Sequence, residues 1–110
     1  HHSRKIISVF QPHRFSRVRL LKKEFAKAFK LCDEVVLCPV YPAGEKINKY
    51  FDYHSFGKLI VKKSNVTVAI LKSENDLLNY FKKNLFDNEL VVCMGAGSIS
   101  SWIKSISKKL

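Results

Sequence analysis

Three of the four arginines of this chain, Arg14, Arg17 and Arg19, lie within six residues of one another, and His13 stands beside them. A guanidinium group presents a planar fork of N–H donors that matches carboxylate and phosphate oxygens. The cluster follows the apolar run 6–10 and precedes a helical pattern, and a helix N-terminus attracts anions. We therefore predict a clamp for an anionic reactant, carried chiefly by Arg14 and Arg17.

The charge balance of this segment also favours a binding role over ordinary surface arginines. Positive charge at a helix N-terminus is unfavourable by a few tenths to about 1 kcal/mol. No acidic residue follows the arginines in sequence before Glu24. A bound anion would offset this cost, and His13 would be a further donor to the same ligand.

Two other loops carry residues suited to the same site. Tyr41-Pro42-Ala43-Gly44-Glu45 follows an apolar run, and Glu45 is the only acid near the expected crevice, where it could orient an arginine or a metal. Gly95-Ala96-Gly97 follows another apolar run, and Ser98 is expected to cap the helix after it. Ser100 occupies the place of the third glycine of a dinucleotide fingerprint, so by itself this turn is equally typical of a tight strand-to-helix connection.

The elements that must position these loops alternate between strands and helices. Continuous apolar runs predict strands over 6–10, 34–40, 67–71 and 90–94. Helical spacing predicts helices over 17–31 with Ser16 as N-cap, over 55–63, after a capping box at 73–76, and after Ser98. Tyr53 and His54 are expected to precede the second of these helices.

Unbroken apolar strands favour a parallel sheet covered on both faces. The predicted fold class is therefore α/β, a Rossmann-like open, mostly parallel sheet of about four strands with helices on both faces. If the strand order is 3-2-1-4, the arginine loop and the glycine turn flank one crevice at the carboxyl ends of the strands, with residues 41–45 beside it.

Composition places limits on the function. The chain has 110 residues, enough for one domain, and it contains no run of about 18 apolar residues. Residues 1–4 are interpreted as a tag remnant or linker, and 5–110 as the domain. The three cysteines, Cys32, Cys38 and Cys93, show no CxxC spacing and predict reduced, mostly buried thiols of a cytoplasmic protein. Neither a pair of histidines at metal-ligand spacing nor a Ser-His-Asp arrangement is evident, so no metal site is predicted.

The net charge of +11 raises the alternative of a small basic module that binds nucleic acid. Its lysines are scattered along the chain, which is more typical of solvated helix faces. The sequence also lacks the G-x-x-x-x-G-K-[ST] loop that cradles ATP phosphates.

The three loops together resemble the C-terminal domain of the Mur ligase family, in particular of its alanine-adding members. The resemblance rests on residues 10–17, 40–45 and 94–97 and extends from about residue 5 to the end. Pro39 stands where the family usually has Asp, Ser98 where Asp or Asn is common, and Phe15 in place of Tyr.

The resemblance implies a ligase of peptidoglycan synthesis that joins L-alanine to UDP-N-acetylmuramate with ATP and Mg²⁺. It implies that this domain lacks an N-terminal UDP-binding domain and a central ATPase domain, and that alone it is inactive and holds no cofactor. His13, Arg14, Arg17, Tyr41 and Glu45 would bind the substrate, and Arg14 and Arg17 would act in catalysis. The turn Gly95, Ala96, Gly97 and Ser98 would lie on the nucleotide side.

Two alternative functions stay open. One is a ligase that attaches a murein peptide to the same sugar nucleotide, and the other is a structural domain whose arginines pair with a partner protein.

Overall fold

Strands and helices alternate along the chain, as the apolar periodicity predicts. The computed structural model describes residues 4–85, 88–95 and 98–110. The elements, in chain order, are β1 (Ile6–Phe10), α1 (Phe15–Lys27), β2 (Glu34–Leu37), α2 (Tyr53–Ser64), β3 (Thr67–Ile70), α3 (Glu74–Asn84), β4 (Leu90–Met94) and α4 (Ser98–Ser107).

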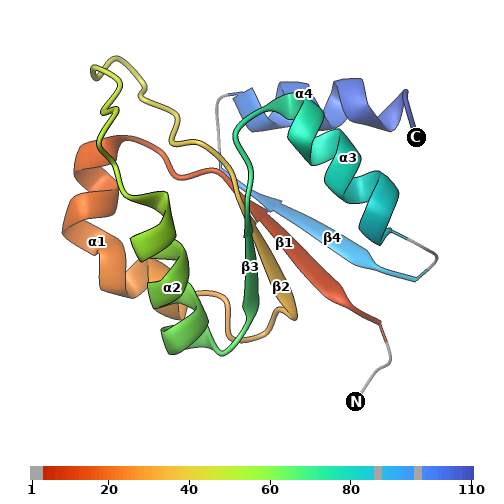
Figure 1. Cartoon of the computed structure of the whole chain (residues 1–110), viewed down its shortest axis with the longest axis horizontal. Helices are drawn as coiled ribbons and strands as arrows, with labels where there is room; N and C mark the ends of the chain where they lie inside the picture. Colours follow the sequence, from red (N-terminus) through yellow and green to blue (C-terminus); the bar gives the residue numbers. More distant parts are fainter. Residues whose placement is uncertain (1–3, 86–87, 96–97) are drawn as a thin grey trace.

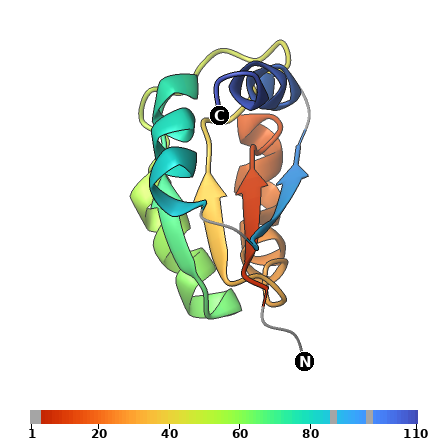
Figure 2. The ribbon, with the colours of Figure 1, turned by 90° about the vertical axis from the view of Figure 1, so that its right-hand side faces the viewer.

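The four strands form one parallel sheet in the order β3-β2-β1-β4 (Figure 2). Helices α1 and α2 cover one face, and α3 and α4 lie on the other (Figure 1). The predicted α/β class and strand order are confirmed. The chain builds outward from β1 to β2 and β3, then crosses to the other side of β1 to add β4. The switch point of the sheet therefore lies between β1 and β4.

The core consists of two apolar clusters, one on each face, because successive strand residues point to opposite sides. Ile7 and Val9 of β1 are fully buried beneath α3 and α4, whereas Phe10 packs beneath α1 and α2. In β2, Val35 and Leu37 face α1 and α2, and Val36 faces the other side. Complete burial of such a side chain contributes about 1.5–3 kcal/mol.

Several element boundaries differ from the sequence prediction. Strand β2 ends at Leu37 rather than at residue 40, close before Pro39, which has no N–H for the ladder. Helix α2 begins at Tyr53 because the Asp52 carboxylate accepts a hydrogen bond from the Ser55 N–H at 2.9 Å. Tyr53 and His54 therefore lie inside the first turn and do not precede it. Helix α1 ends at Lys27, earlier than predicted.

The predicted capping of α3 is confirmed. The Ser73 hydroxyl accepts a hydrogen bond from the Asp76 N–H at 3.1 Å. The Asp76 carboxylate in turn accepts from the Lys72 N–H, also at 3.1 Å. The two side chains thus satisfy backbone donors at the start of the helix reciprocally.

The cysteines are unpaired thiols of differing exposure. Cys38 is buried, which raises the pKa of its thiol to about 12. Cys32 is half-buried and Cys93 is exposed, so the expectation of mostly buried thiols is wrong for Cys93. Within the described part of the chain, every helix is too short or too polar to cross a membrane.

Candidate functional site

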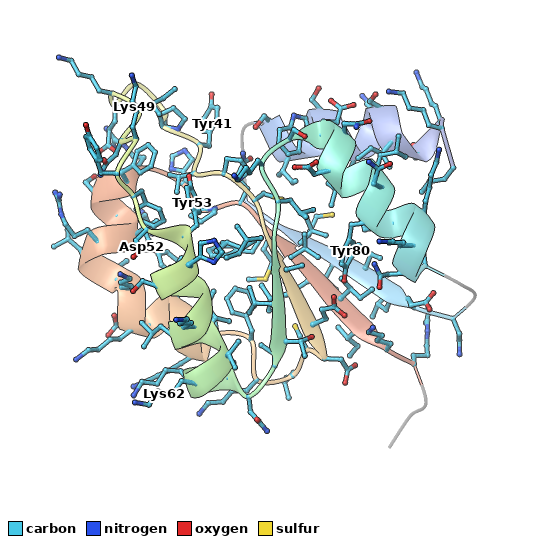
Figure 3. The ribbon with its side chains drawn as sticks, viewed as in Figure 1. Tyr41, Lys49, Asp52, Tyr53, Lys62 and Tyr80 are labelled. Atoms are coloured by element: carbon cyan, nitrogen blue, oxygen red, sulfur yellow. The ribbon has the colours of Figure 1, made fainter. Side chains whose placement is uncertain are left out.

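The loops that follow β1 and β2 run side by side beyond the ends of their strands. The Arg14 N–H donates to the Tyr41 carbonyl at 2.7 Å, and the Tyr41 N–H donates to the Pro12 carbonyl at 2.8 Å. The His13 and Tyr41 rings lie with their centroids 5.7 Å apart. Tyr41 lies at the end of the molecule toward which the strands point, opposite Lys62 (Figure 3). The structure thus brings together the arginine loop and residues 41–45, as predicted.

A register shift separates this loop pairing from the strand ladder. Phe10 pairs with Leu37, whereas His13 pairs with Tyr41, so three steps along one segment match four along the other. The extra residue places the Arg14 loop and the Tyr41 loop in a new alignment, as a β-bulge does.

Because of the register shift, backbone groups of Pro39 and Val40 form hydrogen bonds with side chains instead of with a neighbouring strand. The Gln11 side-chain amide donates to the Pro39 carbonyl at 3.1 Å. The Val40 N–H donates to the Tyr53 hydroxyl at 3.0 Å, and burial raises the pKa of Tyr53. Sequence reasoning assigned no such role to Gln11 or Tyr53.

Glu45 holds the N-terminus of α1. Its carboxylate accepts hydrogen bonds from the Ser16 hydroxyl and, at 3.3 Å, from the Ser16 N–H. It also lies 3.9 Å from the Arg14 Nε. The Ser16 hydroxyl is the main cause that lowers the pKa of Glu45, with the Ser16 and Phe15 amides and the Arg14 charge adding to it.

This geometry corrects two sequence predictions. Arg14, with no side-chain cap, is the residue before α1, and Ser16 lies inside the first turn and is not its N-cap. Glu45, which the Tyr41 loop supplies, lies beside Arg14 and offsets part of the arginine charge. The expectation that an external anion offsets this charge counted only acids close in sequence, and it stays a prediction for Arg17.

Arg14 and Arg17 nevertheless keep exposed guanidinium groups at the start of α1. Half of the Arg14 side chain is exposed, and Arg17 is exposed and forms no ion pair with the residues described. Arg14 has φ 69° and ψ 130°, a backbone conformation that is uncommon for a residue with a side chain. Buried Phe15 between them packs edge-on against Phe51, with ring centroids 5.7 Å apart. The pair therefore projects from an anchored helix start.

The turn after β4 meets the arginine loop through Gln11. The Gln11 N–H donates to the Met94 carbonyl at 2.9 Å, and its side-chain amide donates to the Ser98 hydroxyl at 2.8 Å. Gly95 has φ 132°, and a β-carbon there would lie 2.4 Å from the Gln11 carbonyl oxygen. Gly95 and Ser98 thus lie against Gln11, close before the arginine loop, whereas Ala96 and Gly97 lie outside the described residues.

The N-terminus of α4 is partly occupied by the protein itself. The Ile99 N–H in its first turn donates to the Gln11 side-chain oxygen at 3.0 Å. Ser98 is the first residue of α4 rather than a residue preceding it. Fewer first-turn amides are consequently free to bind an anion than the glycine pattern suggested.

Relatives match nearly the whole length of the chain, although no family model matches it. A UDP-N-acetylmuramate–L-alanine ligase of Pelagibacter ubique is 46% identical over 101 residues, which cover 92% of this chain. Another of Prochlorococcus marinus strain NATL1A is 36% identical over 98 residues, or 88% of this chain. The chain is a homologue of the C-terminal part of these ligases. A UDP-N-acetylmuramate–L-alanine ligase of Rhodospirillum rubrum is 35% identical over 107 residues, or 97% of the chain.

This relationship to UDP-N-acetylmuramate–L-alanine ligases confirms the family resemblance drawn from the three loops. The chain spans only 20–22% of the length of these ligases. The ligase family is thus established for this segment, while the roles of His13, Arg14, Arg17, Tyr41 and Glu45 stay predictions.

Proposed function

We propose that this chain is the C-terminal lobe of an ATP-dependent cytoplasmic ligase that joins L-alanine to UDP-N-acetylmuramate. The observation that carries the proposal is the 46% identity over 92% of the chain to a ligase of that name. The position of the arginine loop, at the carboxyl end of β1 beside the switch point of the sheet, supports it. Open α/β sheets bind their ligands at such a point.

Arg14 and Arg17 would bind the carboxylate of L-alanine. Their exposed guanidinium groups offer forked donors, and the two residues lie three apart at the start of α1, Arg14 directly before the helix and Arg17 in its first turn. When the alanine amine attacks the carboxyl carbon of the sugar nucleotide, activated as an acyl phosphate, negative charge develops on the carbonyl oxygen; the C–O bond to phosphate then breaks, the amine loses a proton, and phosphate leaves. A fixed guanidinium group close to that oxygen would lower the barrier.

His13, Tyr41 and Glu45 would complete this side of the site. The neighbouring rings of His13 and Tyr41 form a wall beside the arginine loop. Glu45 already accepts from Ser16 and lies beside the Arg14 Nε. We therefore assign Glu45 the task of orienting Arg14 rather than direct contact with the substrate.

The described residues do not fit ATP or Mg²⁺ as a complete site. The Glu45 carboxylate already accepts a hydrogen bond from Ser16, and the Ile99 N–H already donates to Gln11. Among the described residues, no three acidic, histidine or cysteine side chains lie close enough together to hold a metal ion. We assign the binding of nucleotide and metal to another part of a longer protein. The isolated chain would then contribute half of the site and be inactive.

Arginine variants of the full-length protein test the proposal. Arg14→Ala and Arg17→Ala are expected to reduce L-alanine-dependent ligation by about 10²-fold or more, the effect of losing a donor to developing charge. Arg19→Ala is the matched control, since Arg19 is also exposed on α1 but lies beyond the clamp. Phosphate release is measured with L-alanine and with a murein peptide as acceptor. Normal turnover of the Arg14 variant would contradict the role, and a preference for the peptide would favour the alternative ligase.

A further inference from the structure

We infer that Gln11 is a positioning residue that holds the arginine loop and the start of α4 in one fixed arrangement. The inference rests on the proposed function, because it assumes that both segments face the same reactants. Gln11 follows β1 directly, and only 2% of it is exposed. It therefore acts from beneath the site, through the residues that it holds.

The Gln11 amide joins three separate segments. Its nitrogen donates to the Pro39 carbonyl, after β2, and to the Ser98 hydroxyl, at the start of α4. Its oxygen accepts from the Ile99 N–H, also in α4. The Gln11 backbone adds a bond to Met94 at the end of β4. One buried group thus ties together the segments that follow β1, β2 and β4.

The chemistry of an amide is needed for this arrangement. A single glutamine supplies two donors and an acceptor at a fixed distance from one another. Methionine has a similar length but offers no comparable donor, and a carboxylate cannot donate to the Pro39 carbonyl. Either change would leave Pro39 or Ile99 without its partner, and a buried polar group without a partner is costly.

No other buried polar side chain in the described segments makes the same connection. The other two are Ser8 and Ser64. The Ser8 hydroxyl donates to the Met94 sulfur at 3.2 Å and is also hydrogen-bonded to the Cys32 side chain, and neither partner belongs to the Pro39 loop or to α4. Ser64 joins the end of α2 to the end of α1, where its hydroxyl donates to the Ala26 carbonyl and accepts from the Phe29 N–H at 3.1 Å. Ser64 therefore lies at the amino ends of β2 and β3, away from the site.

This contrast gives a matched pair of variants, Gln11→Met and Ser64→Ala, in the full-length protein. Both remove a buried side chain's hydrogen bonds, so both are expected to lower the melting temperature. Gln11→Met should also reduce kcat/KM for L-alanine by about 10- to 100-fold, because misplacement of about 1 Å can cost 10²-fold in rate. The KM for UDP-N-acetylmuramate should stay within about twofold of the wild-type value. Most of its binding energy comes from parts of the sugar nucleotide that are remote from the arginine loop, and Gln11→Met leaves those contacts unchanged. Ser64→Ala should leave all kinetic constants unchanged.

Ser98→Ala keeps the test decisive if Gln11→Met fails to fold. Among the residues described, it removes the bond between the Ser98 hydroxyl and Gln11, and it should lower kcat/KM for L-alanine by about 3- to 10-fold, in line with the loss of one hydrogen bond. Unchanged alanine kinetics in Ser98→Ala, or equal effects of Gln11→Met and Ser64→Ala, would overturn the positioning role. If Arg14→Ala retains full activity or the wild type shows no L-alanine-dependent turnover, the proposed function itself fails.

Discussion

The carbonyl oxygen of Gln11 occupies the space in which Gly95 would carry a side chain. A β-carbon on Gly95 would lie only 2.4 Å from that oxygen, and Gly95 also has φ 132°. Gly95→Ala should therefore destabilise the protein by about 3 kcal/mol, from backbone strain and from the overlap with a backbone atom that cannot rotate away. Urea unfolding measures the loss.

Gly44→Ala is the control for the overlap. Gly44 has φ 93°, but a β-carbon there would meet no atom within 4 Å. Strain alone should cost about 1 kcal/mol. Equal losses for the Gly44 and Gly95 variants would show that the loops after β1 and β4 are not in close contact.

Glu45→Gln should make the protein less stable at neutral pH but not at strongly acidic pH. The pKa of Glu45 is lowered in the folded state, chiefly by the Ser16 hydroxyl. A lowered carboxyl pKa stabilises the fold above the ordinary glutamate range, and this contribution disappears as pH falls through the lowered value. The stability difference between wild type and Glu45→Gln should therefore shrink on acidification. Thermal unfolding between neutral and strongly acidic pH measures it.

Glu24→Gln is the matched control for this pH dependence. Glu24 is exposed on the same helix and lies beyond its first turn. Glu24→Gln removes one negative charge from α1 without removing a bond to Ser16, so it should lower stability at neutral pH by less than Glu45→Gln does. A constant difference for Glu45→Gln across the whole range would contradict the Ser16–Glu45 bond.

The strand and helix pattern could be predicted from sequence because each element carries its own periodicity. The runs around Val9, Val36 and Val68 have the continuous apolar character of buried parallel strands. The capping of α3 by Ser73 could also be predicted, since donor and acceptor lie three residues apart. Local spacing therefore sufficed for the element order and for the fold class.

The contacts that organise the site could not be predicted in this way. Glu45 bonds to Ser16 from 29 residues away, and Gln11 bonds to Ser98 from 87 residues away. The sequence indicated Glu45 as a residue that could orient an arginine or a metal. Its bond to Ser16 at the start of α1 could not be predicted, because local sequence does not show which loops fold together. A glutamine between an apolar strand and Pro12 was the available signal for Gln11, since a polar residue there is placed close to the core.

Tyr53→Phe should destabilise the protein by about 1–3 kcal/mol, the cost of leaving a buried polar group without a partner. The Val40 N–H donates to the Tyr53 hydroxyl at 3.0 Å, and Val40 is only 6% exposed. The ring itself should stay in place, because it packs edge-on against Phe51 with centroids 4.7 Å apart. Hydrogen exchange of the Val40 amide should accelerate, and urea unfolding should report the lost stability.

Tyr50→Phe is the control, since Tyr50 is 93% exposed and its hydroxyl is available to water. If both variants are equally stable, the Val40 amide does not depend on Tyr53, and the Tyr41 loop is held by its backbone bonds to Pro12 and Arg14 instead.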